Sequence, residues 1–245
     1  MGRPLGWGLA LLFIALFSSL GYWQLDRARQ KEAMLADADR VLADRVPVAL
    51  ASAADPARAS RYEWAAGEGR FLPTPAILLD NQNLQGRPGL RVYRAFQPAD
   101  TTAPLLVELG WLPVPGDRRL PRLEPVALSQ VSGLLAPPPA SGIATAVATP
   151  QADGSLLATR LDHALIAGAL RQPLLATRVL RLDPTLKFGY ARDLDILPNT
   201  LPPERHLGYA VQWFGLAVAV FVAAFVLSWR SRRRRAGVSR EKMSP

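Results

Sequence analysis

Two long runs without a charged residue, one near each end of the chain, constrain the fold most. The first is PLGWGLALLFIALFSSLGYWQL, residues 4–25, and the second is LGYAVQWFGLAVAVFVAAFVLSW, residues 207–229. Each can cross a hydrocarbon layer of about 30 Å, which takes roughly 20 helical residues. Aromatic residues bracket both runs, as they do at membrane interfaces. We therefore expect transmembrane helices at residues 4–25 and 206–229, with a cleaved signal peptide as the alternative for the first run.

The flanking charges predict which side of a membrane each part of the chain occupies. The second run is followed by RSRRRRAGVSREK, which holds six arginines, and the positive-inside rule places such a segment in the cytoplasm. Two spans put both ends on one side, so residues 1–3 and the basic tail, residues 230–245, are predicted to be cytoplasmic. Residues 26–205 then form an exported domain, which is periplasmic in a bacterium. Because the first span starts by residue 4, a mitochondrial presequence has no room, and we expect a multi-pass protein of a bacterial inner membrane.

Charge and cysteine content exclude several classes of function. The formal net charge is +9, but residues 230–245 hold seven basic residues against one acidic, whereas residues 24–205 hold 21 basic and 19 acidic residues. A basic tail of this kind marks membrane topology, and we expect a lipid bilayer and no nucleic acid as its partner. The chain has no cysteine and only two histidines. Disulfides, thiolate chemistry and multi-histidine metal centres are therefore excluded.

The segment between the two runs is predicted to be an α+β domain with a mainly antiparallel sheet. Residues 24–45 are expected to continue the first helix, and DHALIAGAL to form a short helix capped by Asp162. LLATRVLRL is a further expected strand, and APPPASGIATAVATPQADGS a long loop. The alternation of apolar residues predicts strands at AILLDNQ, LRVYRAFQ and LLVELGWL, joined by the loops NLQGRPG and PADTTAP.

No catalytic constellation emerges, so we do not expect an enzyme and assign no catalytic residue. The serines lie outside a GxSxG turn, and the glycines do not form a phosphate-binding loop. His163 heads an amphipathic helix, where a half-exposed structural histidine is the expectation. Asp193 and Asp195 lie in a polar segment, and we expect both carboxylates to be solvated.

The entrance of the second run carries a concentrated set of polar and aromatic side chains. On a helix with about 100° per residue, His206, Tyr209, Gln212 and Trp213 fall within one sector of roughly 120°. An amide near hydrocarbon is costly without a partner, so this face is expected to contact the first span, another protein or a cofactor. A neutral imidazole beside flat aromatics can ligate a haem iron, with Tyr209 and Trp213 against the porphyrin and Arg205 near its propionates. The alternative is an aromatic belt in which His206 is an interfacial anchor.

Several short motifs occur in one order along the chain. GYWQLDRARQK follows the first run and RHLGYAVQWFGLA enters the second, with GRFL, LLDNQNLQGRPGLRVYRAF, GWLPVPGDR and VSGLL between them. Together with the layout of two spans around an exported domain, these motifs resemble the Surfeit-locus-one family of cytochrome c oxidase assembly factors. Two positions depart from that family. Leu109 stands where members often have arginine, and Arg205 where some have asparagine.

The resemblance implies a non-enzymatic role in building haem–copper oxidase. Members act while haem a is inserted into the catalytic subunit, and bacterial members have been linked to haem a through the histidine that corresponds to His206. It therefore implies haem a as a transient cofactor with its iron on His206, and the oxidase catalytic subunit and haem a synthase as partners. Two alternatives stay open: a scaffold that stabilises the oxidase subunit or the haem synthase and holds no haem, and a membrane-tethered periplasmic enzyme. Around the iron we expect Arg205, Tyr209, Gln212 and Trp213.

Overall fold

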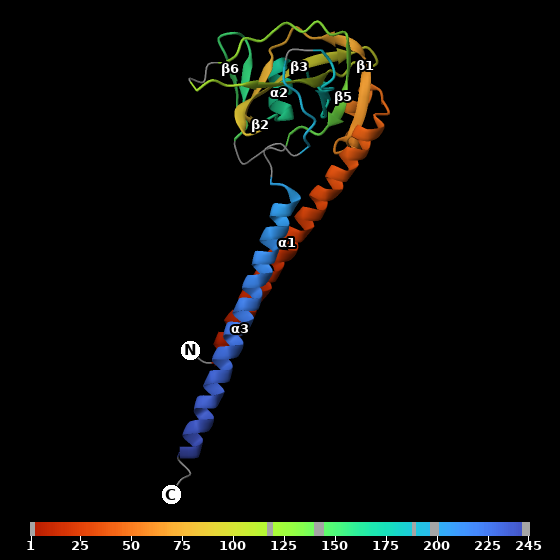
Figure 1. The fold of residues 1–245 in the computed structure, drawn as a ribbon. Coiled ribbons are helices and arrows are strands. Elements are labelled where there is room, and N and C mark those ends of the chain that lie inside the picture. The colour runs from red at the N-terminus through yellow and green to blue at the C-terminus, as the bar shows by residue number, and fades with distance from the viewer. Residues whose placement is uncertain (1–2, 117–119, 140–144, 188–189, 197–200, 242–245) are drawn as a thin grey trace. The chain divides into compact units, whose positions relative to one another are not determined.

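The computed structural model describes residues 3–116, 120–139, 145–187, 190–196 and 201–241. The chain divides into two compact units, each with its own internal packing (Figure 1). Met1–Met34 and Leu201–Pro245 form the first, which we call the helical unit, and Leu35–Thr200 form the second, the sheet unit.

The helical unit consists of most of α1 (Arg3–Asp44) together with α3 (Pro203–Glu241). Both helices are long and apolar enough to cross a membrane, by length and composition alone. Residues 24–45 were predicted to extend the first helix, and α1 does continue unbroken to Asp44, which confirms that expectation. α3 begins with Pro203, whose missing N–H costs nothing in the first turn because that group has no partner within a helix.

α1 and α3 run antiparallel and pack closely in the helical unit (Figure 1). Trp7, near the start of α1, donates its Nε1–H to Ser228 Oγ, near the end of the apolar part of α3, at 2.8 Å. Gly21 permits the close approach, since a Cβ added there would lie 2.8 Å from the ring of Phe214. Tyr22 meets the same ring edge-on, with centroids 5.5 Å apart.

Five strands of the sheet unit close a barrel, and three more extend its sheet. The closed order is β1–β5–β8–β4–β3–β1, and β2, β7 and β6 continue outward from β3. Within the described residues six pairings are antiparallel, and the β2–β7 and β4–β8 pairings are parallel, so the sheet is mixed. The strands are β1 (Glu63–Phe71), β2 (Ile77–Leu84), β3 (Arg87–Pro98), β4 (Leu105–Pro113), β5 (Gln130–Ala136), β6 (Ala148–Pro150), β7 (Leu156–Ala158) and β8 (Val179–Leu182).

The sheet separates two hydrophobic clusters, because successive side chains of a strand point to opposite faces. On β3, Val92 and Phe96 belong to one cluster, which also takes Leu50 of the 3-10 helix η1 (Leu50–Ala54). Tyr93 of β3 belongs to the other cluster, which is covered by α2 (His163–Leu170). A second short 3-10 helix, η2 (Pro56–Arg58), follows η1.

The expected strands around β2, β3 and β4 are confirmed, but the loop between the first two is shorter than predicted. NLQGRPG was expected to be a loop, whereas Leu84 pairs with Arg87 and only Gln85 and Gly86 form the turn. Their φ angles are 53° and 80°, as the two-residue turns that match strand twist require. The prediction of a longer loop gave most weight to the turn-forming residues in this stretch. In the structure, the pairing of β2 with β3 continues through most of them. The second loop, PADTTAP, lies where β3 gives way to β4, as expected.

Two further expectations need correction. LLATRVLRL was predicted as one strand, yet only Val179–Leu182 are β8. Ala176 donates its N–H to the carbonyl of Pro104 and Arg178 to the carbonyl of Ala53 in η1, so neither pairs with a neighbouring strand. The stretch APPPASGIATAVATPQADGS, expected to be a loop throughout, contains β6 (Ala148–Pro150), which pairs with β7. Its residues 140–144 lie outside the described part of the chain.

Candidate functional site

His206 lies in the first turns of α3 and is 7% exposed. Its Nδ1 is 2.7 Å from Oε1 of Gln24 on α1. An amide oxygen only accepts hydrogen bonds, so this contact places the imidazole proton on Nδ1 and leaves a lone pair on Nε2. Nε2 is buried and has no hydrogen-bond partner among the described residues. The arrangement is thus a neutral imidazole, fixed on one nitrogen and free on the other.

Trp213 follows His206 on the same face of α3, seven residues further on. Its indole stacks on Phe17 of α1, with centroids 5.7 Å apart and an angle of 27° between the ring planes. Ala210 and Ala217, spaced to fall on this face, are also buried. The side of α3 that packs on α1 in the helical unit therefore combines a histidine, a tryptophan and two alanines.

The polar and aromatic side chains predicted to share one sector of α3 differ in how much of each is buried. His206 and Trp213 lie against α1, whereas Tyr209 is 40% exposed and Gln212 and Arg205 are also exposed. Helical periodicity gives the angles between these side chains, but the position of α1 decides which of them it covers. Gln24 did not figure among the predicted site residues, although it is the last residue but one of the first uncharged run and belongs to the motif GYWQLDRARQK.

The residues around His206 fit a haem iron as far as the donor is concerned. A ligating histidine commonly donates its second ring N–H to an acceptor, which orients the ring and raises its basicity, and Gln24 Oε1 holds that position. No group of three or more His, Asp or Glu side chains that could hold a metal ion occurs in the described residues. Trp213 is less suited to lie against a porphyrin, because Phe17 already covers one face of its indole.

A second polar cluster lies in the sheet unit, joining β3, β4 and β8. Arg91 pairs with Glu108 and, at 3.1 Å, with both carboxylate oxygens of Asp193. Arg181 also reaches Asp193, at 2.8 Å, and Tyr93 donates to Glu108 at 2.9 Å. The expectation of a solvated Asp193 is therefore wrong: its segment turns back over the sheet and meets two guanidinium groups. Two cations and two anions neutralise one another here, which is the pattern of a structural network.

The comparisons with known proteins decide the family. The model of the SURF1 family matches residues 11–218, which take in most of α1, the sheet unit and nearly the first half of α3. The chain belongs to the SURF1 family. No curated protein matches the chain. The SURF1 family is known as a family of cytochrome c oxidase assembly factors and is not a known class of enzyme.

The other histidine of this SURF1-family chain has a structural contact. His163 opens α2, and its Nε2 lies 2.6 Å from the carbonyl oxygen of Leu175. Asp162 caps the helix, as predicted, by accepting a hydrogen bond from the N–H of Leu165 at 3.0 Å. His163 therefore helps to hold α2 to the following segment, and His206 is the histidine whose second ring nitrogen is buried without a partner among the described residues.

Proposed function

We propose that this SURF1-family protein assists the insertion of haem a into the catalytic subunit of cytochrome c oxidase by holding haem a transiently on His206. The observation that carries the proposal is the buried Nε2, which has no hydrogen-bond partner among the described residues while Gln24 fixes Nδ1. A buried polar atom without a partner is costly, and a ligand at Nε2 would remove that cost. Family membership supports the oxidase as the target.

Each residue of the proposed site has a distinct task. Haem a supplies an iron that accepts the Nε2 lone pair when it is bound. Gln24 keeps the imidazole ring oriented and its second nitrogen protonated. Arg205 and Tyr209, both exposed, are available to the propionates and the porphyrin edge. Gln212, also exposed, offers an amide to the same rim or to a partner helix.

Release of the cofactor is as necessary to this function as binding. A single protein ligand gives a weaker hold than a pair of axial ligands. Trp213 stacks on Phe17 and the free nitrogen of His206 is enclosed, so haem enters only when α1 and α3 separate locally. The return of these helix contacts favours release, which suits a carrier that passes its cargo on.

The membrane arrangement belongs to the same proposal. Residues 4–25 and 206–229 span a bacterial inner membrane, residues 26–205 lie in the periplasm, and residues 1–3 and 230–245 are cytoplasmic. Support comes from the two helices that are long and apolar enough to span, and from the six arginines after Trp229. The oxidase catalytic subunit is the proposed acceptor of haem a, and haem a synthase the proposed donor.

The test is to co-express the protein with a haem a synthase, purify it in detergent and identify any bound haem by its Soret band and by mass spectrometry. The wild-type protein should carry haem a, and His206→Ala should lose it while still inserting into the membrane. His163→Ala is the matched control, since it removes the other histidine and should keep the haem. Full haem content in His206→Ala would contradict the proposal.

A scaffold without haem is the second candidate, favoured by the Phe17–Trp213 stack, which uses for helix packing the ring that was expected to lie on the porphyrin. Both candidates predict less active oxidase when the chain is deleted, with haem a synthesis intact. They differ in His206→Ala, which should lower the haem content of the oxidase only if the protein carries haem. Wild-type protein purified without haem, together with normal oxidase in His206→Ala, would favour the scaffold.

A further inference from the structure

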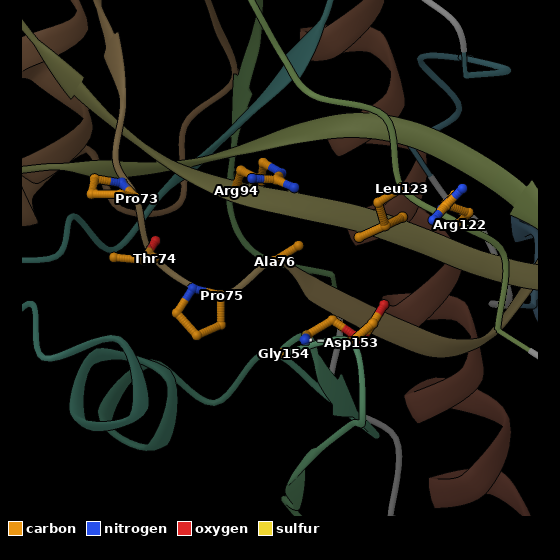
Figure 2. A pocket seen from close by; sticks show the side chains of 10 residues that line it. Pro73, Thr74, Pro75, Ala76, Arg94, Arg122, Leu123, Asp153 and Gly154 are labelled. Carbon is orange, nitrogen blue, oxygen red and sulfur yellow. Dashed lines mark hydrogen bonds between the residues drawn. The ribbon is translucent and has the colours of Figure 1, made fainter.

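A hollow of about 640 Å³ opens in the sheet unit, away from the ionic network of β3, β4 and β8 (Figure 2). Four segments distant in sequence line it: residues 73–76 between β1 and β2, Arg94 on β3, residues 122–123 after β4, and residues 153–155 in the turn between β6 and β7. Its volume lies within the range of roughly 300–1,000 Å³ that is usual for small-molecule sites. Nothing in the proposed haem function uses it.

Arg94 is the most unusual residue of this hollow. It occupies the face of β3 that also carries Val92 and Phe96, both fully buried in the core. A charged side chain at such a position normally has a partner of opposite charge. Arg91 and Arg181 follow that rule through Glu108 and Asp193, whereas Arg94 has no ion pair among the described residues. Its Nε is buried without a hydrogen-bond partner there, as are the Nε atoms of Arg91 and Arg181, so the missing ion pair is what sets Arg94 apart.

Two further groups point to a missing acceptor. Arg122, which also lines the hollow and is exposed, likewise forms no ion pair within the described part of the chain (Figure 2). The Oγ1 of Thr74 is buried without a hydrogen-bond partner among those residues. Pro73 and Pro75 flank this threonine, and each proline fixes its own φ, which limits the freedom of the segment. Two guanidinium groups and one hydroxyl are thus left with donors to offer.

Asp153 sets the charge balance of the hollow. Its Oδ1 accepts hydrogen bonds from the N–H of Ser155 at 3.0 Å and from Ser155 Oγ at 2.6 Å. These bonds lower the pKa of the Asp153 carboxyl, so it is ionised at neutral pH. One carboxylate beside two arginines leaves an excess of one positive charge, which suits an anionic group of low charge.

We propose that this hollow binds a small molecule that bears a carboxylate or phosphate group. Arg94 and Arg122 hold the oxyanion, since a guanidinium fork matches the geometry of either group. Thr74 donates its hydroxyl hydrogen to the same ligand. Asp153 opposes a second negative charge and so limits the ligand to molecules with one anionic group near the arginines.

The experiment is isothermal titration calorimetry of the purified full-length protein, in detergent at low ionic strength, with propionate, inorganic phosphate and the uncharged propionamide. At least one of the anions should bind with a dissociation constant below about 1 mM, and propionamide should not. Arg94→Gln and Arg122→Gln should each weaken binding roughly tenfold or more, because a charge-assisted hydrogen bond is lost. Asp153→Asn should strengthen it. The anion that binds tells whether the natural group is a carboxylate or a phosphate.

Arg87→Gln is the matched control, since Arg87 is an exposed arginine of the same strand that does not line the hollow. It should bind as the wild type does. Unfolding temperatures measured alongside show whether Arg94→Gln still folds, and Arg94→Lys, which keeps the charge, provides a second test with intermediate affinity expected. Failure of both anions to bind, or unchanged binding in Arg94→Gln and Arg122→Gln, would overturn the proposal. Binding of a glutamate-rich peptide without either small anion would also overturn it, by assigning the hollow to a protein partner.

Discussion

His206 and Gln24 are 182 positions apart in the chain, yet one hydrogen bond between them decides what the histidine can do. Without an acceptor at Nδ1, the proton could reside on either ring nitrogen and the ring could rotate. With Gln24 in place, the lone pair is kept on Nε2. The chemistry of the proposed site therefore depends on a residue that carries no charge and would be passed over in a search for catalytic groups.

At this scale we predict that Gln24→Ala weakens haem binding without abolishing it. Loss of a group that orients a metal ligand typically costs roughly 10- to 100-fold in affinity. Titration of the purified protein with haem, followed at the Soret band, gives the change. Gln30→Ala is the control, because Gln30 lies on the exposed side of α1 and bonds Asp26. Equal affinity in Gln24→Ala and the wild type would show that the hydrogen bond has no part in ligation.

The raised pKa of the buried Tyr93 leads us to predict that the stability of the sheet unit depends on pH. Burial, reinforced by the neighbouring Glu108 carboxylate, raises the pKa of Tyr93 well above its ordinary value of 10.0. The native state therefore keeps this proton when the unfolded chain loses it. The stability that results is fully present below about pH 10 and is lost as the pH rises beyond that value.

The check is urea unfolding of the wild type and Tyr93→Phe between about pH 9 and 11. The decline in unfolding free energy with rising pH should be shallower in Tyr93→Phe. Some decline remains, since burial also raises the pKa of Tyr62. The slopes are the quantity to compare, because Tyr93→Phe also loses the hydrogen bond to Glu108 at every pH. Parallel slopes would mean that Tyr93 does not titrate differently in the two states.

Among the elements, β3, β4 and β8 are joined by more than their backbone ladders. Arg91, Glu108 and Arg181 lie on these three strands, and Asp193 closes the cluster from the segment that follows β8. β4 and β8 pair in parallel, and a parallel pair is slightly less stable per residue than an antiparallel one. The ionic network crosses the junction between β4 and β8. It therefore favours this particular pairing of strands where the backbone hydrogen bonds are weaker.

We predict that Glu108→Gln destabilises the sheet unit by about 3–5 kcal/mol, because removal of one partner leaves buried guanidinium charge insufficiently compensated. Chemical denaturation followed by tryptophan fluorescence measures the effect. Asp37→Asn is the control: the Arg40–Asp37 pair is exposed, with 76% and 48% of the two side chains accessible, and such pairs contribute about 0–1 kcal/mol. A loss of the same small size in Glu108→Gln would show that the network does not stabilise the fold.

For the whole molecule, the sheet unit and the two apolar helices belong to one continuous chain whose α1 runs from one unit into the other. If the helices span a membrane as proposed, residues 26–205 and 230–245 lie on opposite sides of it. The absence of cysteine makes this directly testable, since any introduced thiol is the only one in the protein.

Single cysteines at Asp100 and at Arg232, both exposed, serve as probes. In spheroplasts a membrane-impermeant maleimide should label Asp100→Cys and leave Arg232→Cys unlabelled until the cells are lysed. The physical reason is that the arginine cluster around residue 232 resists transfer across the bilayer. Labelling of both positions in intact spheroplasts, or of neither, would rule out the two-span topology.

Local signals in the sequence predicted the features whose causes are local. A long uncharged run of apolar, helix-forming residues favours a helix whatever surrounds it. The two long helices were therefore predicted. Asp162 caps α2 through a backbone N–H three residues away, and the period-2 pattern marked β2, β3 and β4. In LLATRVLRL and NLQGRPG, neighbouring residues could each belong to a strand or to a loop. The predicted boundaries between strand and loop were therefore displaced there.

Only the tertiary structure decided which distant groups meet. The pairing of β1 with β3 that closes the barrel, the bond between Gln24 and His206, and the approach of Asp193 to Arg91 and Arg181 each join separate segments. The sequence placed His206, Tyr209, Gln212 and Trp213 on one sector of a helix, but the packing of α1 covered two of them and left the other two exposed. Periodicity defines the directions of side chains about one axis, whereas burial depends on where the second axis lies, and that position comes from the packing of the whole fold.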